Sequence, residues 1–131
     1  MKSVFKKKNI TFIQKLNMIK IYHNNRCSKS RNSYNLLTEK GFEFETIEYL
    51  KTPLTKGELT ELVSKLGIEA KELVRKGEKD FKENFKGKEL SESEWIDAMI
   101  QFPKLIERPI VVKGNKAVIG RPIERVIELL D

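Results

Sequence analysis

Cys27 has the clearest chemical potential in the sequence, because it stands between a predicted strand and a predicted helix. A thiol at a helix N-terminus lies at the positive end of the backbone dipole, close to N–H groups that have no partner within the helix. Both effects favour the thiolate, and the pKa of such thiols falls to about 3.5–7.5. Arg26, Lys29 and Arg31 add positive charge, and His23 lies four residues upstream. Cys27 is therefore the predicted nucleophile. The alternative, a small buried hydrophobe, fits poorly with a polar turn.

The same helix N-terminus is a site where an anion can bind. An oxyanion beside a thiolate puts two negative groups together, so further cations are needed. Arginine suits this task, because its planar fork binds oxyanions through two hydrogen bonds and keeps its charge. Taken alone, each arginine could equally be an ordinary surface residue. The candidates are Arg75, Arg108, which precedes Pro109, and Arg121, which precedes Pro122.

Two familiar cysteine motifs are excluded by counting residues. A phosphatase loop needs an arginine six positions after the cysteine, but that position is Ser33. A Cys-x-x-Cys redox motif needs a second cysteine where Ser30 stands, and Cys27 is the only cysteine in the chain. An oxidised or covalent form of Cys27 must therefore be released by a thiol from another molecule.

The elements that position Cys27 follow from the hydrophobic pattern. Residues 18–22 and 42–49 are β-prone, and residues 28–40 between them predict a helix that ends at Gly41. The order strand, helix, strand is typical of a βαβ unit with a parallel pair of strands.

A helical region and a second β-rich part follow. Thr55 with Glu58, and Ser91 with Glu94, are spaced as capping boxes that begin two helices. Between these helices, residues 69–76 predict a short helix, and residues 77–90 a surface loop with a helical turn. The C-terminal part predicts a hairpin over 109–119 that turns at Gly114–Asn115, then a terminal helix opened by Pro122. The whole order predicts an α/β fold: a four-stranded mixed sheet flanked by helices, with a helical insertion at about 55–106 between the βαβ and ββα halves.

Composition limits the remaining possibilities. A chain of 131 residues suits one domain, here 18–131, and one cysteine with one histidine cannot form a four-ligand zinc site. No apolar run approaches the roughly 20 residues that cross a bilayer. The net charge is +7, but residues 1–17 hold five lysines and no acid, so the other 21 basic and 19 acidic residues leave only +2. We therefore expect a basic, disordered extension at 1–17, and no nucleic-acid or membrane partner.

Residues 22–32 carry a recognisable signature. Their sequence, Tyr-His-Asn-Asn-Arg-Cys-Ser-Lys-Ser-Arg-Asn, resembles the Tyr-His-Asn-Pro-x-Cys-x-x-Ser-Arg pattern of glutaredoxin-dependent arsenate reductases. Asn25 stands where that family usually has proline. The resemblance continues through residues 73–76, 106–112 and 120–122, and it covers residues 18–130 in total.

The resemblance implies a thioredoxin-like fold with a cis peptide between Arg108 and Pro109. It also implies that Cys27 attacks arsenate and forms a covalent adduct, with His23 helping to keep the thiol ionised. Glutathione then attacks the adduct, and glutaredoxin removes the glutathione so that arsenite is released. No bound cofactor is implied, and we expect a monomer. We also expect a cytoplasmic location, because a free thiol needs a reducing compartment. The implied arsenate ligands are Arg75, Arg108 and Arg121, and the implied supporting residues are Asn24, Ser30 and Arg31.

Two other functions remain open at this point. One is a related thiol-dependent oxidoreductase that acts on a different substrate. The other is a regulator resembling Spx, which shares the fold and binds the C-terminal domain of the RNA polymerase α subunit. Many such regulators sense oxidation through Cys-x-x-Cys, which Ser30 breaks here.

Overall fold

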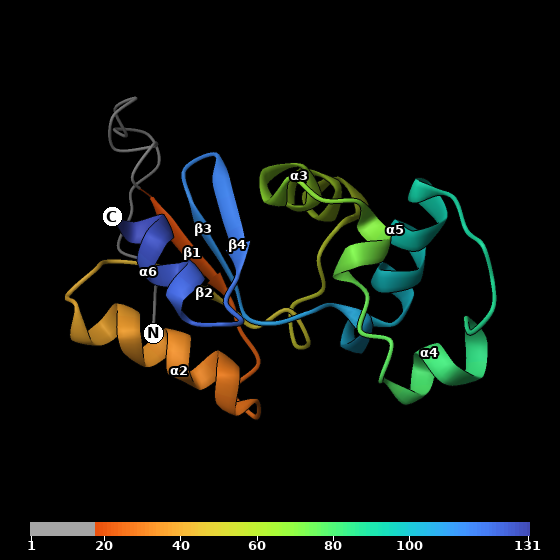
Figure 1. Cartoon of the computed structure of the whole chain (residues 1–131), viewed down its shortest axis with the longest axis horizontal. Coiled ribbons are helices and arrows are strands. Elements are labelled where there is room, and N and C mark those ends of the chain that lie inside the picture. Colours follow the sequence, from red (N-terminus) through yellow and green to blue (C-terminus); the bar gives the residue numbers. More distant parts are fainter. Residues whose placement is uncertain (1–17) are drawn as a thin grey trace. The chain divides into compact units, whose positions relative to one another are not determined.

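The computed structural model describes residues 18–131, which form two compact units (Figure 1). The first unit holds the described residues up to Glu48 together with Arg108–Asp131, and the second unit is Tyr49–Glu107. The extension expected at residues 1–17 lies outside the described part of the chain. Within residues 18–131, no helix has both the length and the apolar character needed to span a bilayer.

The first unit is built on a four-stranded mixed sheet with the strand order β2-β1-β3-β4. Strands β1 and β2 are parallel, and the β1–β3 and β3–β4 pairs are antiparallel. Helix α2 joins β1 to β2, and helix α6 follows β4. The predicted fold class is therefore confirmed. The bounds of these elements are β1 Ile19–Tyr22, α2 Ser28–Glu39, β2 Glu45–Ile47, β3 Ile110–Lys113, β4 Lys116–Ile119 and α6 Glu124–Leu130.

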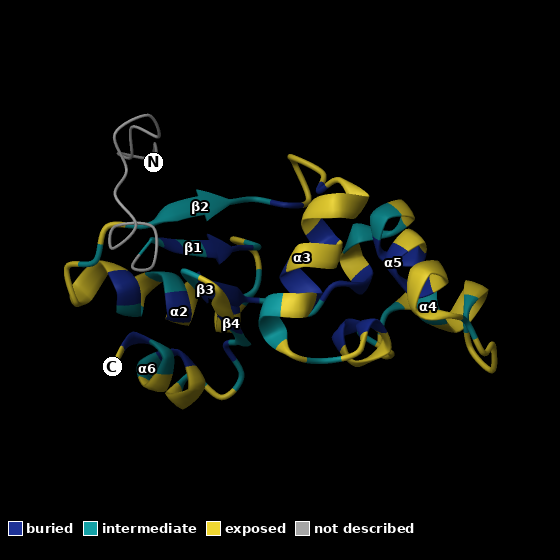
Figure 2. Ribbon diagram, turned by 90° about the horizontal axis from the view of Figure 1, so that it is seen from above, coloured by how far each residue is buried: buried dark blue, intermediate teal, exposed yellow. Residues whose placement is uncertain are grey.

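One face of the sheet carries the core of the first unit. Ile19 and Ile21 point to the same face because side chains alternate along a strand, and Val111 lies opposite Ile21 in the ladder. Leu37 of α2 and Val126 of α6 join them in one buried cluster. Figure 2 shows these buried positions in dark blue on β1, β3 and the inner sides of both helices. Each fully buried side chain of this size contributes about 1.5–3 kcal/mol, so the core holds α2 against the sheet.

Two boundaries differ from those predicted. The second strand covers only Glu45–Ile47, because Phe42 and Phe44 pack against the core cluster from the preceding connection instead of pairing in the sheet. The terminal helix begins at Glu124, two residues beyond Pro122, and the Arg125 N–H reaches back to the Pro122 carbonyl at 3.0 Å. The Arg108–Pro109 peptide is cis, which confirms that expectation, and Arg121–Pro122 is cis as well.

The second unit is helical. Both predicted capping boxes are present, so Thr55 begins α3 and Ser91 begins α5. The helix predicted over residues 69–76 is wrong: Ala70–Leu73 forms a single 3₁₀ turn, because Val74 leaves it to make a β-bridge with Ile106. The helices are α3 Lys56–Leu66, α4 Lys79–Asn84 and α5 Glu92–Gln101, and a second 3₁₀ turn covers Pro103–Leu105.

Trp95 marks the centre of an aromatic cluster within the second unit. Its ring stacks on Phe81 at 6.2 Å between centroids and lies 5.9 Å from Phe85, which meets Phe102 edge-on. This cluster gives the charged segment 77–90 an apolar anchor. The predicted surface loop with a helical turn is therefore held against α5 through α4.

Candidate active site

The turn between β1 and α2 holds Cys27 in place. Cys27 is the N-cap residue of α2, with φ −96° and ψ 124°, and its carbonyl accepts the N–H of Arg31 at 3.0 Å. Its own N–H donates to the Asn24 carbonyl at 3.0 Å. The Asn24 side chain closes the turn by accepting the N–H of Arg26 at 3.0 Å. The thiol is therefore anchored on both sides by backbone hydrogen bonds.

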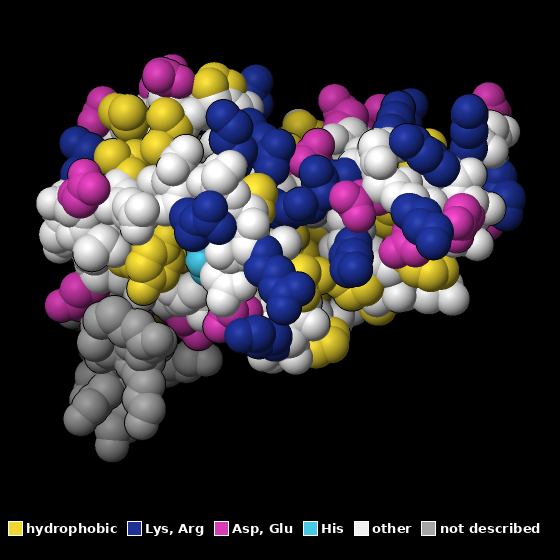
Figure 3. Space-filling view, turned by 90° about the horizontal axis from the view of Figure 1, so that it is seen from below, with side chains coloured by type: hydrophobic (Ala, Val, Ile, Leu, Met, Phe, Trp, Pro, Cys, Tyr) yellow, Lys and Arg dark blue, Asp and Glu magenta, His cyan; other side chains and the backbone are white. Residues whose placement is uncertain are grey.

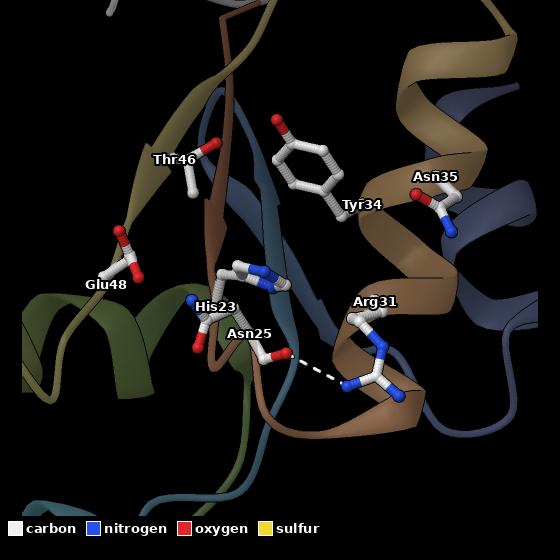
Figure 4. Close-up of a pocket in the computed structure, with 7 residues that line it drawn as sticks. All are labelled: His23, Asn25, Arg31, Tyr34, Asn35, Thr46 and Glu48. Atoms are coloured by element: carbon white, nitrogen blue, oxygen red, sulfur yellow. Dashed lines mark hydrogen bonds between the residues drawn. The ribbon is translucent and has the colours of Figure 1, made fainter. Parts of the chain in front are cut away.

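Arg31 supports the same turn from within α2. Its Nη1 donates to the Asn25 carbonyl at 3.0 Å, seen as the dashed line in Figure 4. Asn25 is the position at which the sequence departs from the signature proline. A hydrogen bond thus restrains a backbone segment that proline would otherwise restrict through its fixed φ.

The sulfur of Cys27 is surrounded by hydrogen-bond donors. Arg121 Nη2 donates to it at 3.2 Å. Burial raises the pKa of the Cys27 thiol. The backbone N–H of Ser30, the Arg108 guanidinium and the backbone N–H of Lys29 outweigh this effect and bring the pKa below its ordinary value. The net result is a larger thiolate fraction at neutral pH, which is the nucleophilic form.

Arg108 and Arg121 meet because of the β3–β4 hairpin. The ladder pairs Ile110 with Ile119, so the residues just outside the two strands lie at the same end of the hairpin. Arg121 Nε donates to the Arg108 carbonyl at 2.8 Å. The Arg108 Nε is buried and has no hydrogen-bond acceptor among the described residues. A buried donor without an acceptor costs about 1–3 kcal/mol, and an anion bound there would supply one.

Gly120 lets this end of the hairpin approach α2 closely. A Cβ at Gly120 would lie 2.8 Å from Ser33 Oγ and 2.9 Å from Pro109 Cγ. The Gly120 N–H also donates to the Pro109 carbonyl at 2.8 Å. The absence of a side chain at Gly120 therefore sets the spacing between the two arginines and the helix that carries Cys27.

His23 is buried, with 6% of its surface exposed, and it contacts the thiol turn through Ser30. Its Nδ1 is hydrogen-bonded to Ser30 Oγ at 2.6 Å, and the same oxygen accepts the Asn24 N–H at 3.0 Å. Burial lowers the pKa of His23; Glu48 raises it and Arg31 lowers it further, with a net decrease from 6.5. The imidazole is therefore mainly neutral at pH 7, and its influence on α2 passes through Ser30 rather than through a positive charge.

His23 also forms part of the wall of a cavity of about 390 Å³ (Figure 4). Tyr34 stacks on the imidazole with 5.2 Å between centroids. Neither Tyr34 nor Glu48 was predicted from the sequence to belong to the site. The β1–β2 ladder pairs Tyr22 with Ile47, so His23 and Glu48 follow at the same end of the two strands. Only the structure gives this register. The lining residues are His23, Asn25, Arg31, Tyr34, Asn35, Thr46 and Glu48.

Arg75 belongs to the second unit, where two carboxylates hold its guanidinium. Nη1 donates to Glu78 Oε2 at 2.6 Å, and Nε lies 3.5 Å from Glu107 Oε1. These contacts fix the guanidinium at the start of the segment that leads to α4. Its role as an oxyanion ligand stays a prediction, whereas Cys27, Arg108 and Arg121 are brought together by the first unit alone.

The charges outside the site are mixed in sign. Figure 3 shows Lys and Arg side chains interspersed with Asp and Glu over the face in view. In the part of the chain that the structure describes, no group of three or more His, Cys, Asp or Glu side chains could hold a metal ion.

Comparisons with known proteins show which proteins this chain resembles in sequence and in fold. The ArsC family model matches residues 22–129. The uncharacterised Escherichia coli (strain K12) protein YfgD is 51% identical over 114 residues, which cover 86% of this chain and 96% of that protein. An arsenate reductase of Neisseria meningitidis serogroup B is 40% identical and covers 86% of this chain and 97% of its own length. The structure of an arsenate reductase from Vibrio cholerae has a TM-score of 0.82 and 42% identity, and covers 87% of this chain and 98% of its own.

Proposed function

Because the chain belongs to the ArsC family, we propose that it is an oxidoreductase that reduces arsenate to arsenite, with Cys27 as the nucleophile. Relatives that are named arsenate reductases at 40% identity support this activity. The observation that carries the proposal is the hydrogen bond from Arg121 Nη2 to Cys27 Sγ at 3.2 Å. It joins a thiol whose pKa is lowered to an arginine that is able to bind an oxyanion.

Arsenate is a tetrahedral oxyanion, and Arg108 and Arg121 are suited to bind its oxygens. The buried Nε of Arg108 needs an acceptor, which an arsenate oxygen supplies. Arg121 already contacts the sulfur, so an oxygen bound to its fork lies close to the nucleophile. In our proposal Arg75 is the third arginine ligand, and it would exchange part of its pairing with Glu78 for the substrate.

The first chemical step forms a bond between sulfur and arsenic. The Cys27 thiolate attacks arsenic(V), and one arsenate oxygen takes up protons and leaves as water. The negative charge on the remaining oxygens is stabilised by the arginines, whose charge does not change with pH in this range. The oxidation state of arsenic does not change in this step, so electrons must come from thiols outside the chain.

Glutathione and glutaredoxin supply those electrons in the proposed cycle. The glutathione thiolate bonds to the arsenic, and a second oxygen leaves as water. A glutaredoxin thiolate then attacks the glutathione sulfur. A mixed disulfide forms, the glutathione–arsenic bond breaks, and its electron pair stays on arsenic, which becomes arsenic(III). Hydrolysis of the Cys27–arsenic bond releases arsenite and returns the thiol. We assign the cycle to the cytoplasm, where thiols stay reduced.

Four further residues keep the nucleophile in position in this proposal. Ser30 links His23 to the start of α2, and its backbone N–H favours the thiolate. Asn24 and Arg31 restrain the turn that holds Cys27. None of these side chains needs to contact arsenate, so they are positioning residues.

A coupled assay tests the proposal. Arsenate-dependent oxidation of NADPH is followed with glutathione, glutaredoxin and glutathione reductase, for the natural chain and for Cys27→Ser. We expect turnover only with the natural chain, because a serine hydroxyl is far less ionised than a thiol at neutral pH. Substantial activity of Cys27→Ser would exclude the thiol mechanism.

An arsenate reductase of known activity serves as the positive control in the same assay. If it turns over and the natural chain does not, the proposed substrate is wrong. The thiol and the arginines would then have to serve a different thiol-dependent reaction or a regulatory role.

A further inference from the structure

A second cavity lies beside the thiol in the first unit and has a volume of about 200 Å³. It shares Arg121 with the sulfur, because Arg121 lines the cavity and its Nη2 donates to Cys27 Sγ at 3.2 Å. A molecule in this cavity can therefore contact the side chain that donates to the nucleophile. The lining residues are Lys29, Asn32, Gly120, Arg121, Pro122, Ile123 and Glu124.

The wall of this cavity combines both signs of charge. Lys29 and Asn32 line it from the first turns of α2, and Glu124 lines it from the start of α6. Pro122 and Ile123 are the apolar side chains of the lining. A cavity lined by a carboxylate on one helix and by an ammonium group and an amide on another suits a small zwitterion. A simple anion would meet repulsion from Glu124.

We propose that this cavity binds the γ-glutamyl end of glutathione, an inference that rests on the proposed use of glutathione by this protein. That end carries an α-ammonium and an α-carboxylate on a single carbon. Glu124 accepts hydrogen bonds from the ammonium, and Lys29 and Asn32 donate to the carboxylate. The cavity is smaller than the roughly 300–1,000 Å³ that encloses a drug-sized ligand, so it takes one end of the tripeptide and leaves the sulfur outside, towards Cys27.

The larger cavity beside His23 is the competing location. It also has both signs of charge, from Arg31 and Glu48. However, Arg31 Nη1 is already used by the Asn25 carbonyl. Arg121, which donates to the Cys27 sulfur, lines the smaller cavity and is not among the lining residues of the larger one. The smaller cavity is favoured because Arg121 belongs to both the cavity and the thiol.

Thiol–disulfide exchange gives a test that needs no arsenate. The Cys27 thiolate attacks one sulfur of glutathione disulfide, a new disulfide forms between Cys27 and one glutathione, and the other glutathione leaves as a thiolate. Mass spectrometry measures the rate of this modification. The rate of modification by bis(2-hydroxyethyl) disulfide, which has no charged group, is measured as a reference. It corrects for changes in the reactivity of Cys27 itself. The measured quantity is the ratio of the two rates.

We expect Glu124→Gln to lower this ratio about two- to fivefold, in line with the loss of one exposed ion pair. Glu128→Gln is the matched control, because Glu128 is exposed on the same helix but does not line the cavity. It should leave the ratio unchanged. Disulfide made from N-acetylglutathione lacks the ammonium, so it should react equally with the natural chain and with Glu124→Gln.

Three results would overturn the proposal. The first is an unchanged ratio in Glu124→Gln. The second is an equal loss in Glu128→Gln, which would point to net charge alone. The third is a loss with Asn35→Ala but none with Glu124→Gln, which would assign glutathione to the larger cavity.

The exchange assay tests the subsite and the arsenate assay tests the substrate, so a negative result in one leaves the other proposal standing. A chain that prefers glutathione disulfide through Glu124 but does not reduce arsenate keeps this subsite and loses the proposed substrate. A chain that reduces arsenate without any effect of Glu124 keeps the activity and loses the subsite.

Discussion

Arg121 donates a hydrogen bond from Nη2 to the sulfur of Cys27 at 3.2 Å, although the two residues are 94 positions apart in the sequence. The same side chain uses Nε to donate to the Arg108 carbonyl at 2.8 Å. One guanidinium therefore joins the nucleophile on α2 to the residue that precedes β3. Two nitrogen atoms of the planar guanidinium donate in fixed directions, which the single ammonium group of lysine cannot reproduce.

Arg121→Lys should weaken the site even though the charge is retained. Lysine has a single nitrogen on a flexible stem, so it cannot make both hydrogen bonds at once. We expect a higher pKa for Cys27 and roughly tenfold slower alkylation at pH 7, consistent with the loss of a hydrogen bond to a charged group. The pH dependence of the rate with iodoacetamide measures this. Arg125→Lys is the matched control, and an identical profile for Arg121→Lys would contradict the assigned role.

Arg108→Lys tests the oxyanion ligand. The buried Arg108 Nε has no acceptor among the described residues, and we expect it to bind an arsenate oxygen. Lysine keeps the charge but loses the fork, so turnover should fall about tenfold or more, as expected for a lost contact to a developing charge. Steady-state kinetics with varied arsenate measures the change. Unchanged kcat and KM would remove Arg108 from the substrate site.

His23 should titrate below its ordinary pKa of 6.5, because burial disfavours its charged form. Between the lower folded value and 6.5, the unfolded chain binds a proton that the folded chain does not. The free energy of unfolding should therefore decrease as the pH falls through this interval, and it should stay constant for this group above it. Urea unfolding at pH 7.5 and below measures the slope, and His23→Asn should reduce it.

The chain has one histidine, so NMR observes the same titration directly. A His23 midpoint at or above 6.5 would contradict the expected decrease in its pKa. Ser30→Ala provides a further comparison, because it removes the hydroxyl that is hydrogen-bonded to Nδ1 at 2.6 Å.

Gly120→Ala should destabilise the first unit. The new Cβ would lie 2.8 Å from Ser33 Oγ and 2.9 Å from Pro109 Cγ, so the hairpin or α2 must move. We expect a loss of about 1–3 kcal/mol of folding free energy, as for other overpacked positions. Thermal unfolding measures it. Gly77→Ala is the control, because nothing lies within 4 Å of a Cβ at that position, and an equal loss there would show that the crowding is not the cause.

The sequence was most informative where one local rule decided the structure. The capping boxes at Thr55 and Ser91 begin helices, and Gly114–Asn115 forms the hairpin turn, because each depends on residues that are neighbours in the chain. The parallel pairing of the first two strands could also be inferred, because two strands joined by a helix usually lie side by side in one sheet. Cys27 at the first turn of α2 was predictable for the same reason.

Predictions from the sequence were wrong where distant contacts decided the structure. Residues 69–76 have a helical pattern, but the bridge between Val74 and Ile106 draws the chain out of the helix. Phe42 and Phe44 have the apolar character of a strand, but they pack on the core instead. Similarly, no local pattern marks Glu124 and Lys29 as lining the same cavity, because that depends on how α6 and α2 are placed by the fold.

The two ends of the β3–β4 hairpin should differ in their tolerance of inserted residues. Arg108 and Arg121 lie at its open end, and the Gly114–Asn115 turn lies at its closed end, four paired positions away. Residues added at the turn would leave the ladder register intact. A single residue added within β4 would instead rotate Arg121 to the other side of the sheet. The turn is therefore the place to attach a fluorophore or an affinity tag. Related chains can also differ in length at this turn and still keep the site.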